Sequence, residues 1–398
     1  MDDTRIAIVG AGPIGLEAAL YASERGYQVD VYERATPGAN VARWSHVRLF
    51  SPWAMNRSGW AERRLREEGV SLADEGDYPT GGEFRREYLL RLARLEDLAD
   101  SIHTHTNVVG VSRRHAFKSD FIGDERRDAE PFVLLVDSED GRRYVEADVV
   151  IDTTGVYDQP RRLGPGGLPA IGEERAELVI ERYIPDALGE ERALYEDATT
   201  LLIGGGYSAV TSAWLLHELR ADAPDTDVLW LLTDGAPPYP PIEDDPLPAR
   251  LELARFGNEA ARGAVDGIEP VFGQLHRLEP TERGVAADID TDDGLSTRQA
   301  DRVVANVGYR PDTALYRELQ VHLCYATEGL MDLSAHLLSQ GAEAAGDCLA
   351  QTSGGFDTLV SPEPNFFVLG SKSYGRHSDF LLQRGFEQIE TLFSHLQP

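Results

Sequence analysis

The chain has 398 residues, 42% of them hydrophobic, and its 68 acidic against 38 basic residues give a formal net charge of -30 at pH 7. This length predicts two or three domains, and the acidic surface argues against binding to nucleic acid or to anionic membranes. The acid excess, with lysine only at Lys118 and Lys372, resembles proteins of salt-accumulating halophiles; a genome that favours arginine would explain the few lysines but not the acid.

The predicted elements include two strand–helix–strand units. The first comprises a strand, a helix and a strand at Ile6–Val9, Leu16–Arg25 and Gln28–Tyr32. We then expect a loop at Trp44–Ser58, a helix at Phe84–Leu98, strands at Val108–Ser112, Pro131–Val136 and Asp148–Gly155, and a linker at Tyr157–Glu173. The second unit lies at about Thr200–Leu232. After it we expect a proline-dense loop at Asp234–Pro248, a helix at Arg250–Ala261, strands at Val271–Leu278, Gly284–Ile289 and Asp301–Gly308, a strand and turn within Ser361–Arg376, and a final helix at Asp379–Leu396.

The turn in the first unit has the pattern G-x-G-x-x-G, from Gly10 to Gly15. In a dinucleotide-binding unit the first glycine makes the tight turn, Gly12 lets the backbone approach the pyrophosphate, and Gly15 allows helix and strand to pack closely. The helix N-terminus attracts the phosphates, and Glu33, after the next strand, can accept hydrogen bonds from both ribose hydroxyls. A glycine-rich turn of an ordinary α/β domain is the alternative, but it does not explain all four features.

The turn in the second unit is GGGYSA, from Gly204 to Ala209, with alanine in the last position, which the looser pattern allows. Asp234 follows the next strand, and no basic residue comes before Arg250. An acid there would repel the 2′-phosphate of NADPH and favour NADH, although the sequence does not settle this choice. Two such turns predict two dinucleotides. Their order, with one unit at the N-terminus and the second inserted later, resembles the two-dinucleotide-binding-domain flavoproteins, which implies FAD on the first turn, NAD(P)H on the second, and hydride transfer between them.

Several segments resemble the two-dinucleotide-binding-domain flavoproteins, in particular the flavin-containing monooxygenases and the bacillithiol-disulfide-reductase-like proteins. They are ARWSHVRLFSP (42–52), YPTGGEFRREYLLRLA (78–93), VVIDTTGVYDQP (149–160), ANVGYRPD (305–312) and PNFFVLGSKSYGR (364–376). The resemblance implies an α/β fold with two Rossmann-like domains. An FAD domain at 1–165 and 309–398 would then be interrupted by an NAD(P)H domain at 166–308.

The resemblance also implies which residues contact the cofactors. For FAD these are Gly10, Gly12, Pro13, Ile14, Gly15, Glu33, Arg34, Trp44, Arg48, Ser51, Val109, Thr154, Gly155 and Gly370. For NAD(P)H they are Gly204, Gly206, Tyr207, Ser208, Ala209 and Gly308.

Departures from these relatives bear on the reaction. Where bacillithiol-type reductases carry cysteine in the first turn, this chain has Ile14, and it lacks the CxxC of thioredoxin reductases. In many relatives an acidic residue follows the glycine of the closing segment. Here Gly370 is followed by Ser371, and the Gly-Asp sequence within 344–351 is the second candidate for that segment. The insertion typical of N-hydroxylating monooxygenases is not evident. We expect monooxygenation of a small organic substrate. The alternatives are a reductase of an electron carrier or a small disulfide, and a flavin-binding redox sensor without turnover.

Two residues are candidates for chemistry beyond cofactor binding. Lys372 could stabilise negative charge on the flavin or hold an anionic substrate; a surface lysine or a phosphate contact is the alternative, and Tyr374, Arg376 and His377 share this uncertainty. His46 could donate a proton near the flavin or be a plain surface histidine. Trp44 could stack on the flavin or belong to the core.

The two cysteines, Cys324 and Cys348, are too far apart in sequence for a CxxC pair, so we expect neither a disulfide scaffold nor a metal site. Cys348 is either a redox thiol or a small buried hydrophobe. The first ten residues carry no signal-peptide pattern, and no stretch reaches the roughly 20 apolar residues of a membrane span. We therefore expect a cytoplasmic protein that acts on a small molecule. The sequence does not decide whether it forms a homodimer.

Overall fold

A computed structural model describes residues 4–233, 239, 245–340 and 354–396. The chain has an α/β fold and divides into two compact units. Unit 1 comprises residues 1–45, 51–159 and 310–398, and unit 2 comprises residues 46–50 and 160–309. Unit 2 is joined to unit 1 between residues 159 and 160 and between residues 309 and 310. The sequence predicts the corresponding domain boundaries at 165/166 and 308/309.

Unit 1 is built on a parallel sheet with the strand order β16-β7-β1-β2-β3. Its strands are β1 (Arg5–Val9), β2 (Gln28–Tyr32), β3 (Ile102–His103), β7 (Val149–Asp152) and β16 (Phe366–Val368). An antiparallel sheet of three strands forms a second layer, with β4 (Asn107–Arg113), β5 (Phe132–Ser138) and β6 (Gly141–Ala147).

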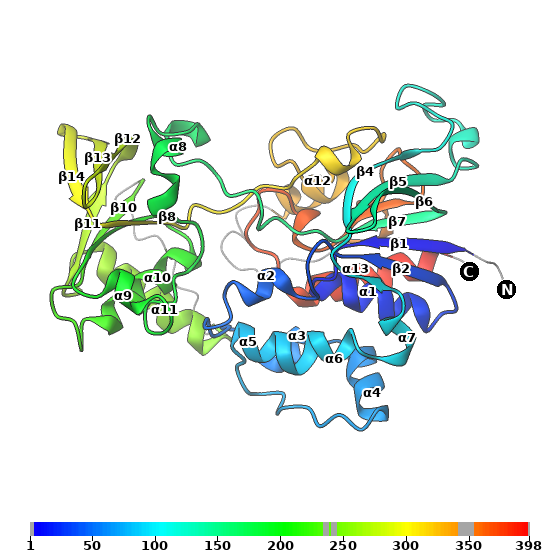
Figure 1. Ribbon diagram of the computed structural model, residues 1–398, viewed down its shortest axis with the longest axis horizontal. Helices are drawn as coiled ribbons and strands as arrows, with labels where there is room; N and C mark the ends of the chain where they lie inside the picture. The colour runs from blue at the N-terminus through cyan, green and yellow to red at the C-terminus, as the bar shows by residue number, and fades with distance from the viewer. Residues whose placement is uncertain (1–3, 234–238, 240–244, 341–353, 397–398) are drawn as a thin grey trace. The chain divides into compact units, whose positions relative to one another are not determined.

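Alternating side chains of β1 decide which layer covers each face of the parallel sheet. Ile6 and Ile8 pack into a core with helices α1 and α13, whereas Ala7 and Val9 pack into a core with β4 and β5. Figure 1 shows this unit with α1 and α13 on one side of β1 and β2, and the antiparallel strands on the other. Its helices are α1 (Pro13–Ser23), α2 (Ala39–Ala42), α3 (Trp53–Asn56), α4 (Gly59–Glu67), α5 (Gly81–Phe84), the π-helical turn η1 (Arg85–Leu89), α6 (Leu90–Leu92), α7 (Glu96–Ala99), α12 (Met331–Ser339) and α13 (Leu382–His395).

Unit 2 has the same three layers. Its parallel sheet has the order β11-β10-β9-β15-β8, with β8 (Ile180–Glu181), β9 (Thr199–Ile203), β10 (Asp227–Leu232), β11 (Ile268–Phe272) and β15 (Arg302–Ala305). Leu202 and Trp230 face the core under the helices, and Leu201 and Leu231 face the antiparallel layer. The helices are α8 (Glu173–Ala176), α9 (Arg192–Tyr195), α10 (Tyr207–Leu219) and α11 (Pro248–Ala261), and the antiparallel strands are β12 (Gln274–Thr281), β13 (Gly284–Thr291) and β14 (Gly294–Ala300).

Three sequence predictions need correction. The helix predicted at Phe84–Leu98 begins at Gly81, after a capping box formed by Thr80 and Glu83, and its helical turns end at Leu92 before a separate α7. The strand predicted at Val271–Leu278 is two strands, β11 and β12. The loop predicted at Trp44–Ser58 contains the short helix α3. In the described part of the chain, no helix is long and apolar enough to cross a membrane.

Candidate functional site

The first glycine turn joins β1 to α1 at the carboxyl edge of the parallel sheet in unit 1. Gly10 has a φ of 100°, which a residue with a side chain rarely adopts. A Cβ atom on Gly15 would lie 1.9 Å from the carbonyl oxygen of Gly10. A Cβ on Gly12 would meet no atom of the described chain within 4 Å. The turn therefore needs Gly10 and Gly15 for its own packing, whereas Gly12 borders open space that a phosphate can occupy.

The N-terminus of α1 has no side-chain cap. Pro13 stands in its first turn, and the N-cap Gly12 offers no side chain to the first N–H groups, so an anion can accept their hydrogen bonds. Ile14 is buried, and a Cβ on Gly385 of α13 would lie 2.2 Å from its Cδ1. The Ile14 side chain thus packs α1 against α13, and a cofactor contact there would have to come from its backbone.

The Glu33 carboxylate lies beside the same turn. Its Oε2 accepts a hydrogen bond from the backbone N–H of Ala11, and its Oε1 accepts one from that of Ala35, both at 2.8 Å. Each oxygen keeps a second lone pair for a ribose hydroxyl. The neighbouring Arg34 is half-exposed and forms an ion pair with Asp158.

Two further turns meet the glycine turn at this edge. Gly155, after β7, has a φ of 69°, and Gly370, after β16, has a φ of 76°. A Cβ on Gly155 would lie 3.6 Å from Oγ of Ser371, and one on Gly370 would lie 3.2 Å from Cγ1 of Ile14. The chain runs from β1 to β2 on one side, while β7 flanks β1 on the other. Such a switch point in strand order is where ligands of open α/β sheets bind, and the structure gathers there Gly10, Gly12, Gly15, Thr154, Gly155 and Gly370.

Lys372 is buried behind these turns. Its Nζ donates hydrogen bonds to Oδ2 of Asp152 at 2.6 Å and to Oγ1 of Thr154 at 2.9 Å. The Lys372 side chain is 1% exposed and that of Asp152 is 0% exposed. The ammonium group therefore lies in a buried ion pair, and Asp152 is a residue of the site that the sequence analysis missed. An acid at the end of the otherwise apolar run VVID was the available signal.

The remaining predicted FAD contacts are more scattered. The indole of Trp44 packs on the N-terminus of α5, because a Cβ on Gly81 would lie 2.4 Å from its ring. Its Nε1 is buried and has no hydrogen-bond partner among the described residues. Ser51 is buried and hydrogen-bonded to Asn56 at 3.2 Å. Val109 lies on β4 in the antiparallel layer, with its side chain 41% exposed.

Two predicted residues of the same loop belong to unit 2. His46 has a buried Nε2 atom without a hydrogen-bond partner in the described part of the chain, and Arg48 is exposed.

The second glycine turn joins β9 to α10 and repeats the geometry of the first. Gly204 has a φ of 134°, and a Cβ on it would lie 2.2 Å from the carbonyl oxygen of Asn306. A Cβ on Gly206 would meet nothing within 4 Å in the described chain. Two side chains hold the turn: Trp230 Nε1 donates to the carbonyl of Gly204 at 2.8 Å, and Tyr239 OH donates to that of Gly206 at 2.9 Å.

The residues after this turn begin α10. Tyr207 is half-buried, with its ring centre 5.2 Å from that of Tyr239. Ser208 is exposed and Ala209 is fully buried. Gly308, which follows β15, has a φ of 82°. Asp234 and Cys348, with the Gly-Asp sequence of 344–351, lie outside the described residues.

The structure also shows a buried acid that the sequence analysis did not single out. Glu17 of α1 is 0% exposed and accepts hydrogen bonds from Ser58 Oγ, at 2.6 Å, and from the Tyr88 hydroxyl. Burial raises the pKa of Glu17 to about 7, against the lowering effect of these hydrogen bonds. Its partners lie 41 and 71 positions away in sequence, so no local pattern could have indicated the cluster.

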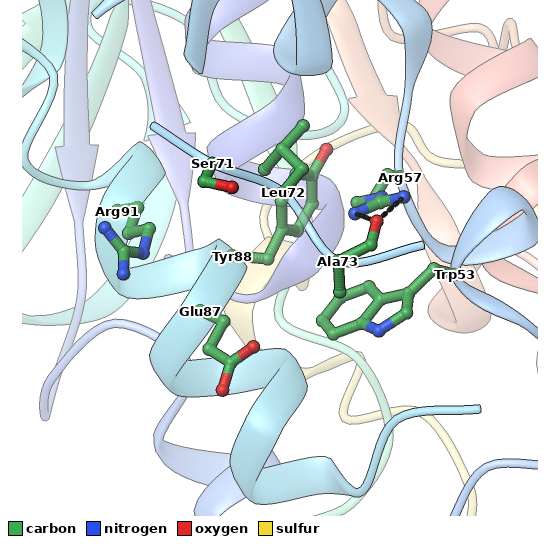
Figure 2. Close-up of a pocket in the computed structure, with 8 residues that line it drawn as sticks. All are labelled: Trp53, Arg57, Ser71, Leu72, Ala73, Glu87, Tyr88 and Arg91. Carbon is green, nitrogen blue, oxygen red and sulfur yellow. Dashed lines mark hydrogen bonds between the residues drawn. The ribbon is translucent and has the colours of Figure 1, made fainter. Parts of the chain in front are cut away.

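A small pocket lies next to this cluster. Figure 2 shows it between α3, the loop at 71–73 and the helical segment that carries Tyr88, with Arg57 donating two hydrogen bonds to the carbonyl of Ala73. Its volume is about 30 Å³, which is room for a few water molecules at most. The glycine turns, rather than this pocket, are the candidate dinucleotide sites.

Comparison with known proteins gives the family. The profile described as pyridine nucleotide-disulphide oxidoreductase matches residues 4–361. The bacillithiol disulfide reductase of Bacillus cereus has a similar structure, with a TM-score of 0.68, 19% identity, and 98% of each chain covered. A flavin-containing monooxygenase from Stenotrophomonas maltophilia is also similar, with a TM-score of 0.56, 19% identity, and 99% of each chain covered.

A curated relative, the thiamine thiazole synthase of Pyrobaculum islandicum, is 66% identical over 32 residues. That match spans only 8% of this chain and 12% of the relative.

Proposed function

Because the chain belongs to the pyridine nucleotide-disulphide oxidoreductase family, we propose that it is a flavoenzyme that binds FAD in unit 1 and NAD(P)H in unit 2. The observation that supports this most directly is the repeated geometry of the two turns. In each, the first glycine has a positive φ that a residue with a side chain rarely adopts, while the glycine at the helix N-terminus borders open space.

The residues of unit 1 fit FAD. The uncapped N-terminus of α1 and the open side of Gly12 would receive the pyrophosphate, and Glu33 would accept from the ribose hydroxyls. The turns at Gly155 and Gly370 would line the rest of the cofactor. Trp44 offers a buried N–H that has no partner in the described chain.

The residues of unit 2 fit a second dinucleotide. Gly206 and the N-terminus of α10 would receive its pyrophosphate, since the N-cap Gly206 offers no side-chain hydrogen bond. The hydrogen bonds from Trp230 and Tyr239 fix the carbonyls of Gly204 and Gly206 and so support the conformation of the turn.

FAD supplies a ring system that accepts a hydride from NAD(P)H and passes electrons on. The chain's own contribution is to bind and orient the two dinucleotides. For the second half-reaction we propose oxygenation of a small organic substrate, with His46 as a proton donor and Lys372 near the flavin. The buried, unpartnered Nε2 of His46 in the described chain leaves a proton position for a ligand. Reduction of an electron carrier or a small disulfide is the alternative, and we expect the enzyme to work in the cytoplasm.

Anaerobic reduction of the purified protein tests this proposal. The protein, kept in high salt, should be yellow, and NADH or NADPH should bleach its visible spectrum. Oxygen consumption that rises with an added small substrate would support oxygenation, whereas reoxidation without such coupling would favour the reductase. Colourless protein that takes up no added FAD would contradict the proposal, and a flavin that neither nicotinamide reduces would indicate a sensor.

Two substitutions separate the cofactor sites. Gly12→Val and Gly206→Val each place a side chain in open space, at negative φ angles of -76° and -93° that valine tolerates. The first variant should fold and lose FAD. The second should keep FAD and lose reduction by NAD(P)H. Gly59→Val is the matched control, because its Cβ also meets nothing within 4 Å in the described chain, and it should behave as the wild type.

A further inference from the structure

The Lys372–Asp152 pair forms a closed network. Lys372 has three N–H donors, of which two reach Asp152 and Thr154, and its Nζ lies 5.1 Å from the ring centre of Tyr316. The Thr154 hydroxyl accepts from Lys372 and donates to Oδ1 of Asp152 at 2.7 Å, and the Thr154 backbone N–H donates to the same oxygen at 3.0 Å. Among the described residues, every polar side-chain atom of the pair has a partner.

This network makes an extended Lys372 unfavourable. For the ammonium group to reach into the open space beside Gly12, it would have to leave Asp152 as a buried carboxylate without a counter-charge. Removing one partner of a buried ion pair is strongly destabilising, because the remaining charge is not solvated. Lys372 therefore acts from within the protein, through the residues that it holds.

The ion pair between Lys372 and Asp152 joins two turns of the proposed FAD site. Asp152 ends β7 and leads into the turn at Gly155, while Lys372 belongs to the turn that begins at Gly370. Gln388 of α13 holds the second turn from the other side, because its Oε1 accepts from the Gly370 N–H at 2.9 Å. The ion pair is thus a cross-link between two turns that approach each other closely at Gly155 and Ser371.

We propose that Lys372 and Asp152 are a positioning pair, which sets the spacing of the turns at 153–155 and 370–373 and cancels its own charge beside the flavin. This inference rests on the proposed function, since it takes FAD as the ligand of these turns. It differs from a role in which Lys372 itself touches flavin or substrate.

The test compares three variants of the full-length protein: Lys372→Met, Asp152→Asn, and the double variant. We measure the dissociation constant of FAD from the apoprotein and the midpoint potential of the bound flavin. Lys372→Met leaves Asp152 uncompensated, so it should weaken FAD binding by at least about tenfold and lower the potential. Asp152→Asn leaves the ammonium uncompensated and should raise the potential. The double variant should restore both quantities, with FAD affinity within about threefold of the wild type.

Opposite shifts of the potential with recovery in the double variant would support the pair, because loss of structure alone does not produce opposite signs. A double variant as impaired as Lys372→Met, beside a nearly normal Asp152→Asn, would overturn the inference and assign Lys372 a direct contact. If Lys372→Met does not fold, the double variant still decides, since it removes both buried charges. Failure of the wild type to bind FAD would instead refute the proposed function.

Discussion

Replacing Glu17 with glutamine removes a carboxyl group from the interior of unit 1. Glu17 is fully buried, and in the described chain it forms no ion pair with arginine, lysine or histidine. Glutamine keeps the size of the side chain and an oxygen that can accept the hydrogen bond from Ser58, and its amide can donate to the Tyr88 hydroxyl. The substitution therefore changes charge and leaves packing nearly unchanged.

The effect of this substitution should depend on pH. Burial raises the pKa of Glu17 from 4.5 to about 7, so between these values the folded state holds a proton that the unfolded chain has lost. The stabilisation is complete below pH 4.5 and disappears as pH rises through about 7. A shift of this size corresponds to about 3 kcal/mol in total, and about 2.5 kcal/mol of it falls between pH 5 and pH 8. Glutamine does not titrate, so the variant should gain that amount relative to the wild type over this range.

The assay is unfolding in urea at fixed salt. Hydrogen exchange of the α1 amides serves as the readout, so that the measured free energy of unfolding is that of unit 1. The range from pH 5 to pH 8 stays above the isoelectric point of about 4.6. Glu67→Gln is the control, because it removes an exposed carboxyl from α4 and should keep the wild-type dependence on pH. Parallel stability curves for the wild type and Glu17→Gln would refute the reasoning.

Three further substitutions follow from the packing of unit 1. Gly15→Ala should prevent folding or FAD binding, because its Cβ would lie 1.9 Å from a backbone oxygen; a normal thermal transition with bound FAD would contradict this. Glu363→Ala should lower the free energy of unfolding by about 3–5 kcal/mol, since Arg113 and Arg127 would stay buried without their carboxylate, and denaturant unfolding measures the loss. Tyr374→Phe should leave stability unchanged or raise it by about 1 kcal/mol, because the hydroxyl is buried without a partner in the described chain; a melting temperature several degrees lower would show that the hydroxyl has one.

Local patterns were enough to predict the two glycine turns between strand and helix and most of the parallel strands. The strand at Gln28–Tyr32 has the predicted limits, because alternating polar and apolar residues bounded by turns are typical of a half-buried strand. The antiparallel strands β6 and β14 were missed. Their sequences, GRRYVEA and GLSTRQA, carry mostly exposed side chains, and pairing with β5 and β13 decides their conformation rather than any periodicity of their own.

The sequence by itself determined the superfamily, the α/β class and the positions of both glycine turns, because these features depend on residues that are neighbours in the chain. Only the tertiary structure decided the environments of Lys372 and Glu17. The partner of Lys372 lies 220 positions away, and those of Glu17 are the N-cap residue of α4 and a residue of η1. The state of a buried charge depends on which groups surround it in space and how well water is excluded. Neither the surrounding groups nor the exclusion of water can be predicted from the residues that neighbour the charged residue in sequence.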